Sequence, residues 1–166
     1  MYQVLKYSFC LMIFIFYPLF AFALPEDSHA KIHIVADSSI YNYKNGTSIF
    51  EGHVQVDQGT THITADRLIT KNDSQHKIHE AIAYGLQKPA HYWTLPKRGE
   101  KRIYAKAEVI KFYPMDANIT LKNNVSITQG ENYFQGQLIL FNNTDQTITV
   151  PKSSPNRSVL IYNPES

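Results

Sequence analysis

Three acidic residues, each directly after an alanine, are the strongest candidates for acid–base chemistry in this sequence. They are Asp37, Asp66 and Glu108. A hydrolase with paired carboxylates would need two of them on one face. The chain has no Gly-x-Ser-x-Gly motif, and its one cysteine is Cys10, near the start of the chain. A repeated structural role near strand ends, with the side chains facing outward, explains the three residues more simply, so we do not expect an enzyme.

Seven histidines raise the question of a metal site. His53 and His62 each adjoin apolar residues of an alternating pattern, so their side chains should face outward when those residues face inward. His76 and His79 lie in a charged turn region. No spacing places three ligands on one face, which a protein zinc site requires. We therefore expect neither a metal nor a cofactor.

Four cations surround the dipeptide Gly99-Glu100: Lys97, Arg98, Lys101 and Arg102. Such side chains form charge-assisted hydrogen bonds with phosphates, although a solvated turn would have the same composition. Just before this cluster, Tyr92 and Trp93 follow Pro89-Ala90. Aromatic residues with a polar tip suit the rim of a site that is apolar at one end and wet at the other. A structural aromatic pair beside a turn is the alternative interpretation.

The N-terminal segment has the features of a secretory signal peptide, which we place at residues 1–23. It has one cation, Lys6, followed by an apolar run that ends in the small-x-small sequence Ala21-Phe22-Ala23. An uncleaved membrane anchor is the alternative, although the run is short for a spanning helix. Residues 24–166 then form a single domain, with a core over 31–150 and a loose, Pro-containing tail over 151–166. The net charge of +2 argues against nucleic acid as a partner.

Beyond the N-terminal segment, apolar and polar residues alternate with period two, which predicts β-strands. Turn signals such as Gln58-Gly59 and Gln129-Gly130 separate the strands. We expect ten or eleven short strands in an all-β, antiparallel sandwich or barrel.

The alternation itself is repeated after 71 positions. Shifted by that number, Ile32 falls on Ile103, Val54 on Val125 and Ile63 on Phe134, and the match runs over 32–69 against 103–140. We interpret it as a duplicated four-strand unit. One copy cannot bury its apolar face alone, whereas two stacked copies can.

Two such sheets facing each other and held slightly open would form a V-shaped trough with an apolar lining. The residues of the repeated strands that share the inward phase are Ile32, Ile34, Val54, Val56, Ile63, Ala65, Ile119, Leu121, Val125, Ile127 and Phe134. They serve either as core or as a lining for lipid. Strands in linear succession also leave a first and a last exposed edge, and exposed edges accept further strands.

The stretch GHVQVDQGTTHITADRL, residues 52–68, resembles a motif of the OstA-like family, which includes LptA-type lipopolysaccharide-transport bridge proteins. AYGLQKPAHY (83–92) and IHIVAD (32–37) resemble further segments of the same family, and the likeness covers roughly 31–150. Three positions depart from the family pattern. His53 stands where the pattern has asparagine, Asn123 where glycine is expected, and a glycine before Pro89 is replaced.

This resemblance implies an open, twisted antiparallel β-jellyroll built from two similar units. It also implies that the protein is located in the periplasm. It implies a non-enzymatic carrier of lipid A that joins copies of itself end to end. The chain of copies would connect an inner-membrane-anchored LptC-like protein with the N-terminal domain of an outer-membrane LptD-like protein. By the resemblance, Ile32, Ile34, Tyr92 and Phe112 match the lipid-lining face, and the basic cluster could hold lipid A phosphates.

Two alternatives remain open at this point. One is the membrane-anchored LptC-like partner, which has the same fold. The other is a secreted β-sandwich adhesin or carbohydrate-binding module, which would bind sugar through exposed aromatic residues.

Overall fold

A computed structural model describes residues 30–116, 118–142, 145, 147–152 and 157–164. The predicted signal peptide lies outside these residues. Within the described part the chain forms twelve strands and no helix, so the predicted all-β class is confirmed. The strands are β1 (Ile32–Val35), β2 (Ser38–Asn42), β3 (Thr47–Gln58), β4 (Thr61–Asn72), β5 (Ile78–Tyr84), β6 (Ala90–Thr94), β7 (Ile103–Ala107), β8 (Val109–Tyr113), β9 (Asn118–Gln129), β10 (Asn132–Asn142), β11 (Thr147–Thr149) and β12 (Val159–Ile161).

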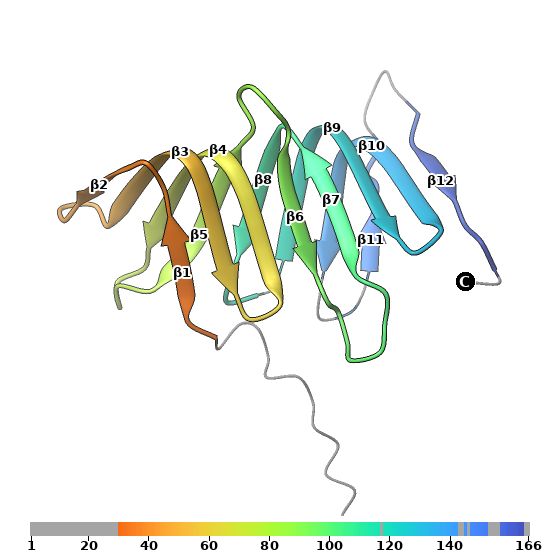
Figure 1. Ribbon diagram of the computed structural model, residues 1–166, viewed down its shortest axis with the longest axis horizontal. Helices are drawn as coiled ribbons and strands as arrows, with labels where there is room; N and C mark the ends of the chain where they lie inside the picture. The colour runs from red at the N-terminus through yellow and green to blue at the C-terminus, as the bar shows by residue number, and fades with distance from the viewer. Residues whose placement is uncertain (1–29, 117, 143–144, 146, 153–156, 165–166) are drawn as a thin grey trace, which may run out of the picture.

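The strands build two antiparallel sheets that share their four long members. One sheet has the order β1-β3-β4-β6-β7-β9-β10-β12. The other has the order β2-β3-β4-β5-β8-β9-β10-β11. Strands β3, β4, β9 and β10 bend at their middles and contribute one half to each sheet. Figure 1 shows β1 and β2 at one end of the molecule, with β10, β11 and β12 at the other.

The bend is a β-bulge that forms a corner between the two sheets. The register of β3 shifts between Glu51 and Val54, and the two residues between them have positive φ, with Gly52 at 79° and His53 at 44°. In β9 the same place is taken by Asn123 and Asn124, at 63° and 50°. Asparagine tolerates this left-handed conformation better than most residues. The departure from glycine at position 123 therefore preserves the corner.

Asp37 and Glu108, two of the three acidic residues that follow alanines, stabilise this corner through hydrogen bonds. Asp37 donates its N–H to the Gly52 carbonyl (2.9 Å), and its carboxylate lies 2.8 Å from Nδ1 of His53. Glu108 repeats the arrangement, donating its N–H to the Asn123 carbonyl (3.1 Å) and accepting from Asn124 Nδ2 (2.5 Å). These contacts give the two residues the structural role expected from the sequence.

Asp66 secures the adjacent loop between β5 and β6. Its Oδ2 accepts hydrogen bonds of 2.6 Å from the backbone N–H groups of Leu86 and Gln87. The bond from Gln87 is the main cause that lowers the pKa of Asp66 below its usual value. Hydrogen bonds to the ionised form stabilise the carboxylate.

The duplication is confirmed and extends further than the sequence match. β1 to β4 and β7 to β10 begin at positions separated by 71 residues, as Ile32 and Ile103 illustrate. In addition, β5 and β6 both pair with β4, while β11 and β12 both pair with β10. Each unit therefore has six strands, β1–β6 and β7–β12. The two units join through the pairs β6·β7 and β5·β8.

Part of the tail that we expected to be loose is ordered. Val159–Ile161 forms strand β12, which pairs with β10 through Phe134 and Leu160. The polar stretch that begins at Pro151 suggested a disordered end. Strand β12 instead adopts the position beside β10 that β6 has beside β4.

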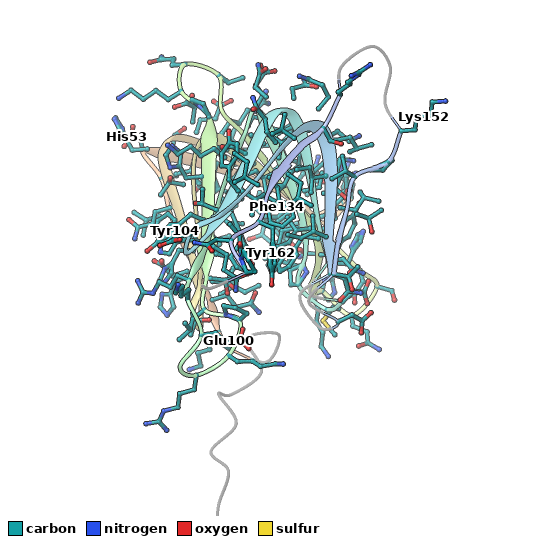
Figure 2. All side chains as sticks on the ribbon, turned by 90° about the vertical axis from the view of Figure 1, so that its right-hand side faces the viewer. His53, Glu100, Tyr104, Phe134, Lys152 and Tyr162 are labelled. Carbon is teal, nitrogen blue, oxygen red and sulfur yellow. The ribbon has the colours of Figure 1, made fainter. Side chains whose placement is uncertain are left out.

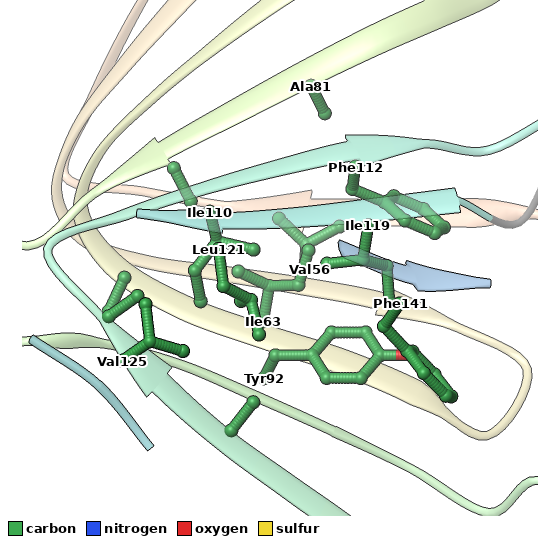
Figure 3. Packing of buried hydrophobic residues seen from close by; sticks show 14 of the residues in the cluster. Val56, Ile63, Ala81, Tyr92, Ile110, Phe112, Ile119, Leu121, Val125 and Phe141 are labelled. Atoms are coloured by element: carbon green, nitrogen blue, oxygen red, sulfur yellow. The ribbon is translucent and has the colours of Figure 1, made fainter. Parts of the chain in front are cut away.

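Between the two sheets lies an apolar core. Its members come from both sheets and from both units, and several of them are drawn in Figure 3. Val125 and Ile110 have no exposed surface, and Leu121 is 1% exposed.

Seen along the sheets in Figure 2, His53 lies on the corner side and Glu100 at the opposite end.

Candidate functional site

The predicted lipid-lining residues divide into two classes. Eight are buried in the core: Val54, Val56, Ile63, Tyr92, Phe112, Leu121, Val125 and Ile127. Four are half-buried and pack against that core: Ile32, Ile34, Ala65 and Phe134. The inward phase was therefore assigned correctly, but the middle of the interior is filled by its own side chains. Tyr92 is 2% exposed, so it is a structural aromatic residue of the core, which was the alternative interpretation of this position.

Half-buried apolar residues lie mostly at the two ends of the interior. Ile32, Ile34, Phe50 and Ile78 lie at the end formed by β1 and β2. Phe134, Ile148 and Val150 lie at the end formed by β11 and β12. These side chains are accessible and still continuous with the core. Ile148 and Val150 continue the alternation seen in the sequence, but they were not among the residues predicted to line a lipid site.

A small cavity connects the first of these ends with the core. It is lined by Ile32, Ile34, Val56, Leu68, Thr70, Ile78, Ala81, Phe112 and Pro114, which come from both sheets. Its volume is about 10 Å³, close to the smallest that can hold one water molecule. An acyl chain could enter only if the sheets moved apart along this side. Ile32 and Ile34 lie on β1, which pairs only with β3 among the described strands, so little pairing opposes such movement.

Away from the corner, the inner surface becomes polar. Thr61 and Thr94 are buried, and their hydroxyl oxygens lie 3.0 Å apart. Gln58 is also buried, and its Nε2 donates to the Ala30 carbonyl at 3.3 Å. Ser48 and Thr70 occupy paired positions on the facing sheet. All five of these polar residues are buried, and we call Ser48, Gln58, Thr61, Thr70 and Thr94 the polar rim. Their inward phase was readable from the alternation with neighbours such as Ile63.

The basic cluster lies on the same side as the polar rim. Lys97, Arg98, Lys101 and Arg102 are all exposed in the loop between β6 and β7, which begins just after Thr94. Gln129 Nε2 donates to the Lys101 carbonyl at 3.3 Å, which holds this loop against the turn between β9 and β10. Going away from the corner, the apolar interior is therefore followed by the polar rim, and the polar rim by the basic cluster.

The described histidines near the sheets make other contacts. His62 Nδ1 lies 2.5 Å from Asp57 Oδ1, and its ring stacks on Trp93 at 5.1 Å between centroids. The Trp93 side chain faces outward because its neighbour Tyr92 faces the core. Burial, followed by the charge of Lys106, lowers the pKa of His91. Among the described residues no group of three metal-ligating side chains comes together.

Comparison with known proteins agrees with this architecture. A family model described as "LptA/(LptD N-terminal domain) LPS transport protein" matches residues 33–147, from β1 to the start of β11. The chain belongs to this family. The family resemblance seen in the sequence is thereby confirmed.

Two curated relatives of this family are similar along most of the chain. The lipopolysaccharide export system protein LptH of Pseudomonas aeruginosa is 27% identical over 134 residues, which are 81% of this chain and 75% of LptH. The lipopolysaccharide export system protein LptA of Escherichia coli (strain K12) is 26% identical over 121 residues, which are 73% of this chain. The match spans 64% of that LptA, less than two thirds of its length.

The fold has a solved counterpart in the same family. The crystal structure of LptH from Pseudomonas aeruginosa, described as the LptA-homologous periplasmic component of a lipopolysaccharide transport device, superposes with a TM-score of 0.77. The match covers 84% of this chain and all of that chain, at 24% identity. It establishes the β-jellyroll fold. Within the described residues, no helix has the length and apolar character that a membrane span requires.

Proposed function

We propose that this protein carries lipopolysaccharide across the periplasm, with the acyl chains of lipid A between its two sheets. The single observation that carries the proposal is the polarity gradient of the interior. Half-buried apolar residues such as Ile34 lead to the polar rim, and the rim leads to the exposed cations of the basic cluster. An amphipathic lipid with phosphates has the same order of parts. Membership of a family of LPS transport proteins supports this ligand over other lipids.

The closed interior sets a limit on how the lipid binds. Burial of a methylene group is worth about 0.8 kcal/mol, so one chain of twelve to fourteen carbons gains on the order of 10 kcal/mol before the costs of binding. Several fully enclosed chains would dissociate too slowly for a carrier. An interior that is packed in its middle and opens only along the edge strands would hold the chains partly, and partial burial favours transfer to the next protein.

The proposed phosphate contacts come from the basic cluster. Lys97, Arg98, Lys101 and Arg102 are exposed and lie beyond the polar rim, where a headgroup would sit if the acyl chains lay inside. Charge-assisted hydrogen bonds to phosphate are among the stronger polar contacts.

The proposed role also includes assembly. Copies of the chain would join end to end, with an inner-membrane-anchored LptC-like protein at one end and the N-terminal domain of an LptD-like protein at the other. The open edges at β1 and β12 support strand addition. The periplasmic location would follow from the signal peptide predicted at residues 1–23. A carrier of this kind needs no catalysis, and the corner contacts of Asp37 and Glu108 leave these carboxylates in structural roles.

A binding experiment tests the carrier function. The purified chain is incubated with lipopolysaccharide or with vesicles of zwitterionic phospholipid, and the bound lipid is quantified after gel filtration. Saturable retention of lipopolysaccharide, without retention of phospholipid, is expected. Equal retention of both lipids would contradict a specific carrier, and retention of neither would contradict lipid binding altogether.

A further inference from the structure

One row of outward-facing side chains is aromatic on the sheet that contains β6 and β7. The row crosses the strands, because the register places His62 on β4 opposite Trp93 on β6, and Trp93 opposite Tyr104 on β7. Thr128 on β9 lies opposite Tyr104, and Tyr133 on β10 lies opposite Thr128. We call His62, Trp93, Tyr104 and Tyr133 the aromatic row.

The aromatic row is accessible from outside the molecule. Tyr104 is 49% exposed, and the other three side chains are half-buried. Figure 2 shows Tyr104 on the outer side of the molecule, away from the core. The rings of His62 and Trp93 stack, with 18° between their planes. From His62 to Tyr133 the row covers four strand spacings, about 19 Å, which suits an extended ligand better than a single small molecule.

A second outward row, parallel to the aromatic row, consists of hydrogen-bonding side chains. It lies two residues further along each strand, where Thr64 pairs with His91 and His91 with Lys106. The polar row, as we call it, comprises Gln55, Thr64, His91, Lys106, Ser126 and Gln135. Aromatic faces pack against the apolar faces of sugar rings, and amide, hydroxyl and imidazole groups bond to sugar hydroxyls. Two such rows side by side suit a glycan.

The polar row leads into a pocket beside the corner. The pocket has a volume of about 300 Å³. Gln55, Thr64 and His91 line it from the polar row, and Lys88 and Pro89 line it from the loop before β6. Ligand sites in proteins begin at about this size. The pocket therefore offers room for one substituent of a chain that lies along the two rows.

His91 belongs to both the polar row and the pocket, and its protonation state suits a sugar hydroxyl. Burial, followed by the charge of Lys106, lowers its pKa. Its imidazole is therefore neutral at pH 7, so one ring nitrogen donates and the other accepts. A hydroxyl group also both donates and accepts.

Aromatic residues are not a general feature of the outward positions. On the outer face of the other sheet the corresponding positions are isoleucines, where Ile49 pairs with Ile69 and Ile69 with Ile82. Isoleucine satisfies strand propensity as well as an aromatic residue does. Trp93, the single tryptophan of the chain, lies in the aromatic row. Strand propensity alone therefore does not account for this face.

The charges beside the two rows favour a ligand that carries carboxylates. The nearby acidic side chains already have partners, because Asp57 contacts His62 and Asp66 accepts backbone N–H groups of the β5–β6 loop. Lys88 and Lys106 are exposed, and neither forms an ion pair within the part of the chain that the structure describes. The basic cluster adds further cations in the loop that joins β6 and β7.

We propose that this outer face binds the carboxylated glycan of the cell wall, peptidoglycan. Sugar rings stack on the aromatic row, the polar row bonds to their hydroxyl and amide groups, and Lys88 and Lys106 pair with carboxylates. The inference goes beyond lipid carriage and depends only on the proposed periplasmic location. The face and the interior lie on opposite sides of one sheet, so the wall could hold the protein in place while its interior receives lipid.

Co-sedimentation with insoluble glycans tests the ligand. The purified chain is mixed with peptidoglycan sacculi or with chitin, a glycan without carboxylates, and the bound fraction is measured over a range of protein concentrations. We expect saturable binding to sacculi and weaker binding to chitin, with a difference that shrinks at high salt because exposed charges are screened. Equal binding to both glycans, or binding to neither, would overturn the proposal.

Two variants test the location of the binding surface. Tyr104→Ala removes an exposed ring and should weaken binding to sacculi about fivefold. Lys106→Gln should weaken binding to sacculi about threefold and leave binding to chitin unchanged. Tyr84→Ala is the matched control, because it removes a half-buried, outward ring from β5 on the other sheet. Thermal unfolding checks that each variant folds. Full binding by Tyr104→Ala and Lys106→Gln, or an equal loss in Tyr84→Ala, would exclude this face.

Lipopolysaccharide retention by the same proteins separates this inference from the carrier function. Retention should be unchanged in Tyr104→Ala and Lys106→Gln, because both side chains face away from the interior. Loss of lipopolysaccharide retention in these variants, with normal binding to sacculi, would assign the face to the saccharide of lipopolysaccharide and overturn the proposal. A parent chain that binds sacculi but retains no lipopolysaccharide would count against the carrier and support the glycan face.

Discussion

Ile63 on β4 and Phe134 on β10 occupy the same position in the two repeats, but only Ile63 is fully covered. Ile63 pairs with Tyr92 and is 2% exposed, because β6 is itself covered by β7. Phe134 pairs with Leu160, which is 62% exposed because β12 has no further strand beside it among the described residues. The difference between these two residues locates the accessible part of the interior at the ends of the molecule.

An acidic residue in the interior at the β1 end should weaken the binding of lipopolysaccharide. Ile34→Asp places a carboxylate among the apolar residues that line the small cavity, where a charge without a partner is costly. We expect lipopolysaccharide to bind at least tenfold more weakly, a loss of about 1.4 kcal/mol or more. Titration with fluorescent lipopolysaccharide measures the affinity.

The neighbouring residue provides the control for that variant. His33→Asp introduces the same carboxylate on the same strand, but its side chain is exposed and faces outward. Its affinity should remain within about twofold of the parent, a difference below 0.5 kcal/mol. If Ile34→Asp folds normally and still binds as the parent does, the apolar end takes no part in binding.

Charge reversal in the basic cluster should weaken binding without affecting the fold. In the double variant Lys97→Glu and Arg98→Glu, both side chains are exposed, so the melting temperature should hardly change. Lipopolysaccharide affinity should fall several-fold, and the difference should shrink at high salt because exposed charges are screened.

The matched control for charge reversal is Lys106→Glu with Lys122→Glu. This variant makes the same change in net charge at exposed positions outside the loop. It should bind almost as the parent does. An equal loss in both double variants would mean that net charge, and not the position of the cluster, governs binding.

Glu80 should contribute stability that depends on pH. Its carboxylate is bound by Lys71 at 2.7 Å and by Lys111 at 3.6 Å, and the hydrogen bond from Lys71 is the main cause that lowers its pKa. A group with a lowered folded pKa stabilises the fold above its unfolded pKa, about 4.3, and loses that contribution as the pH falls through the folded value. Glu80→Gln should therefore reduce the free energy of unfolding by about 1–2 kcal/mol at pH 7.

Denaturant unfolding at several pH values measures this effect. The difference between Glu80→Gln and the parent should shrink progressively below about pH 4, where the parent carboxylate becomes protonated. Glu51→Gln is the control, since the ion pair of exposed Glu51 with half-buried Arg67 remains accessible to solvent and should contribute less than about 1 kcal/mol. A difference at Glu80 that persists unchanged in acid would exclude the ionic explanation.

The sequence predicted the strands and their repetition because both depend on local alternation and on turn residues. Period-two patterns fixed the inward phase of Val54, Val56 and Ile63, and Gln58-Gly59 marked a turn in each unit. The distance between two facing sheets cannot be predicted from a local sequence pattern. The alternation therefore did not reveal that Tyr92 is buried in the core. Strand β12 was missed because its equivalence to β6 depends on pairing with β10, a contact between residues distant in sequence.

The corner should be more sensitive to substitution than a free loop with similar backbone. Gly52→Ala combines a positive φ of 79° with a Cβ that would lie 2.2 Å from Asp37 Oδ2. Gly99→Ala has φ of 88° and meets nothing within 4 Å. We expect a loss of about 1 kcal/mol at Gly99 from backbone strain alone, and a loss of about 2–3 kcal/mol at Gly52. Thermal unfolding compares the two, and equal losses would show that the Asp37 contact is unimportant.

Site-specific photo-crosslinking in living cells tests the central claim most directly. A photoreactive amino acid is introduced at Ile34, which faces the interior, or at Tyr104, which is 49% exposed and faces outward on β7. After irradiation, the adducts are identified by blotting for lipopolysaccharide. Adducts from Ile34 and none from Tyr104 are the result expected of a carrier that holds lipid between its sheets. Adducts from Tyr104 alone, or equally from both positions, would contradict it.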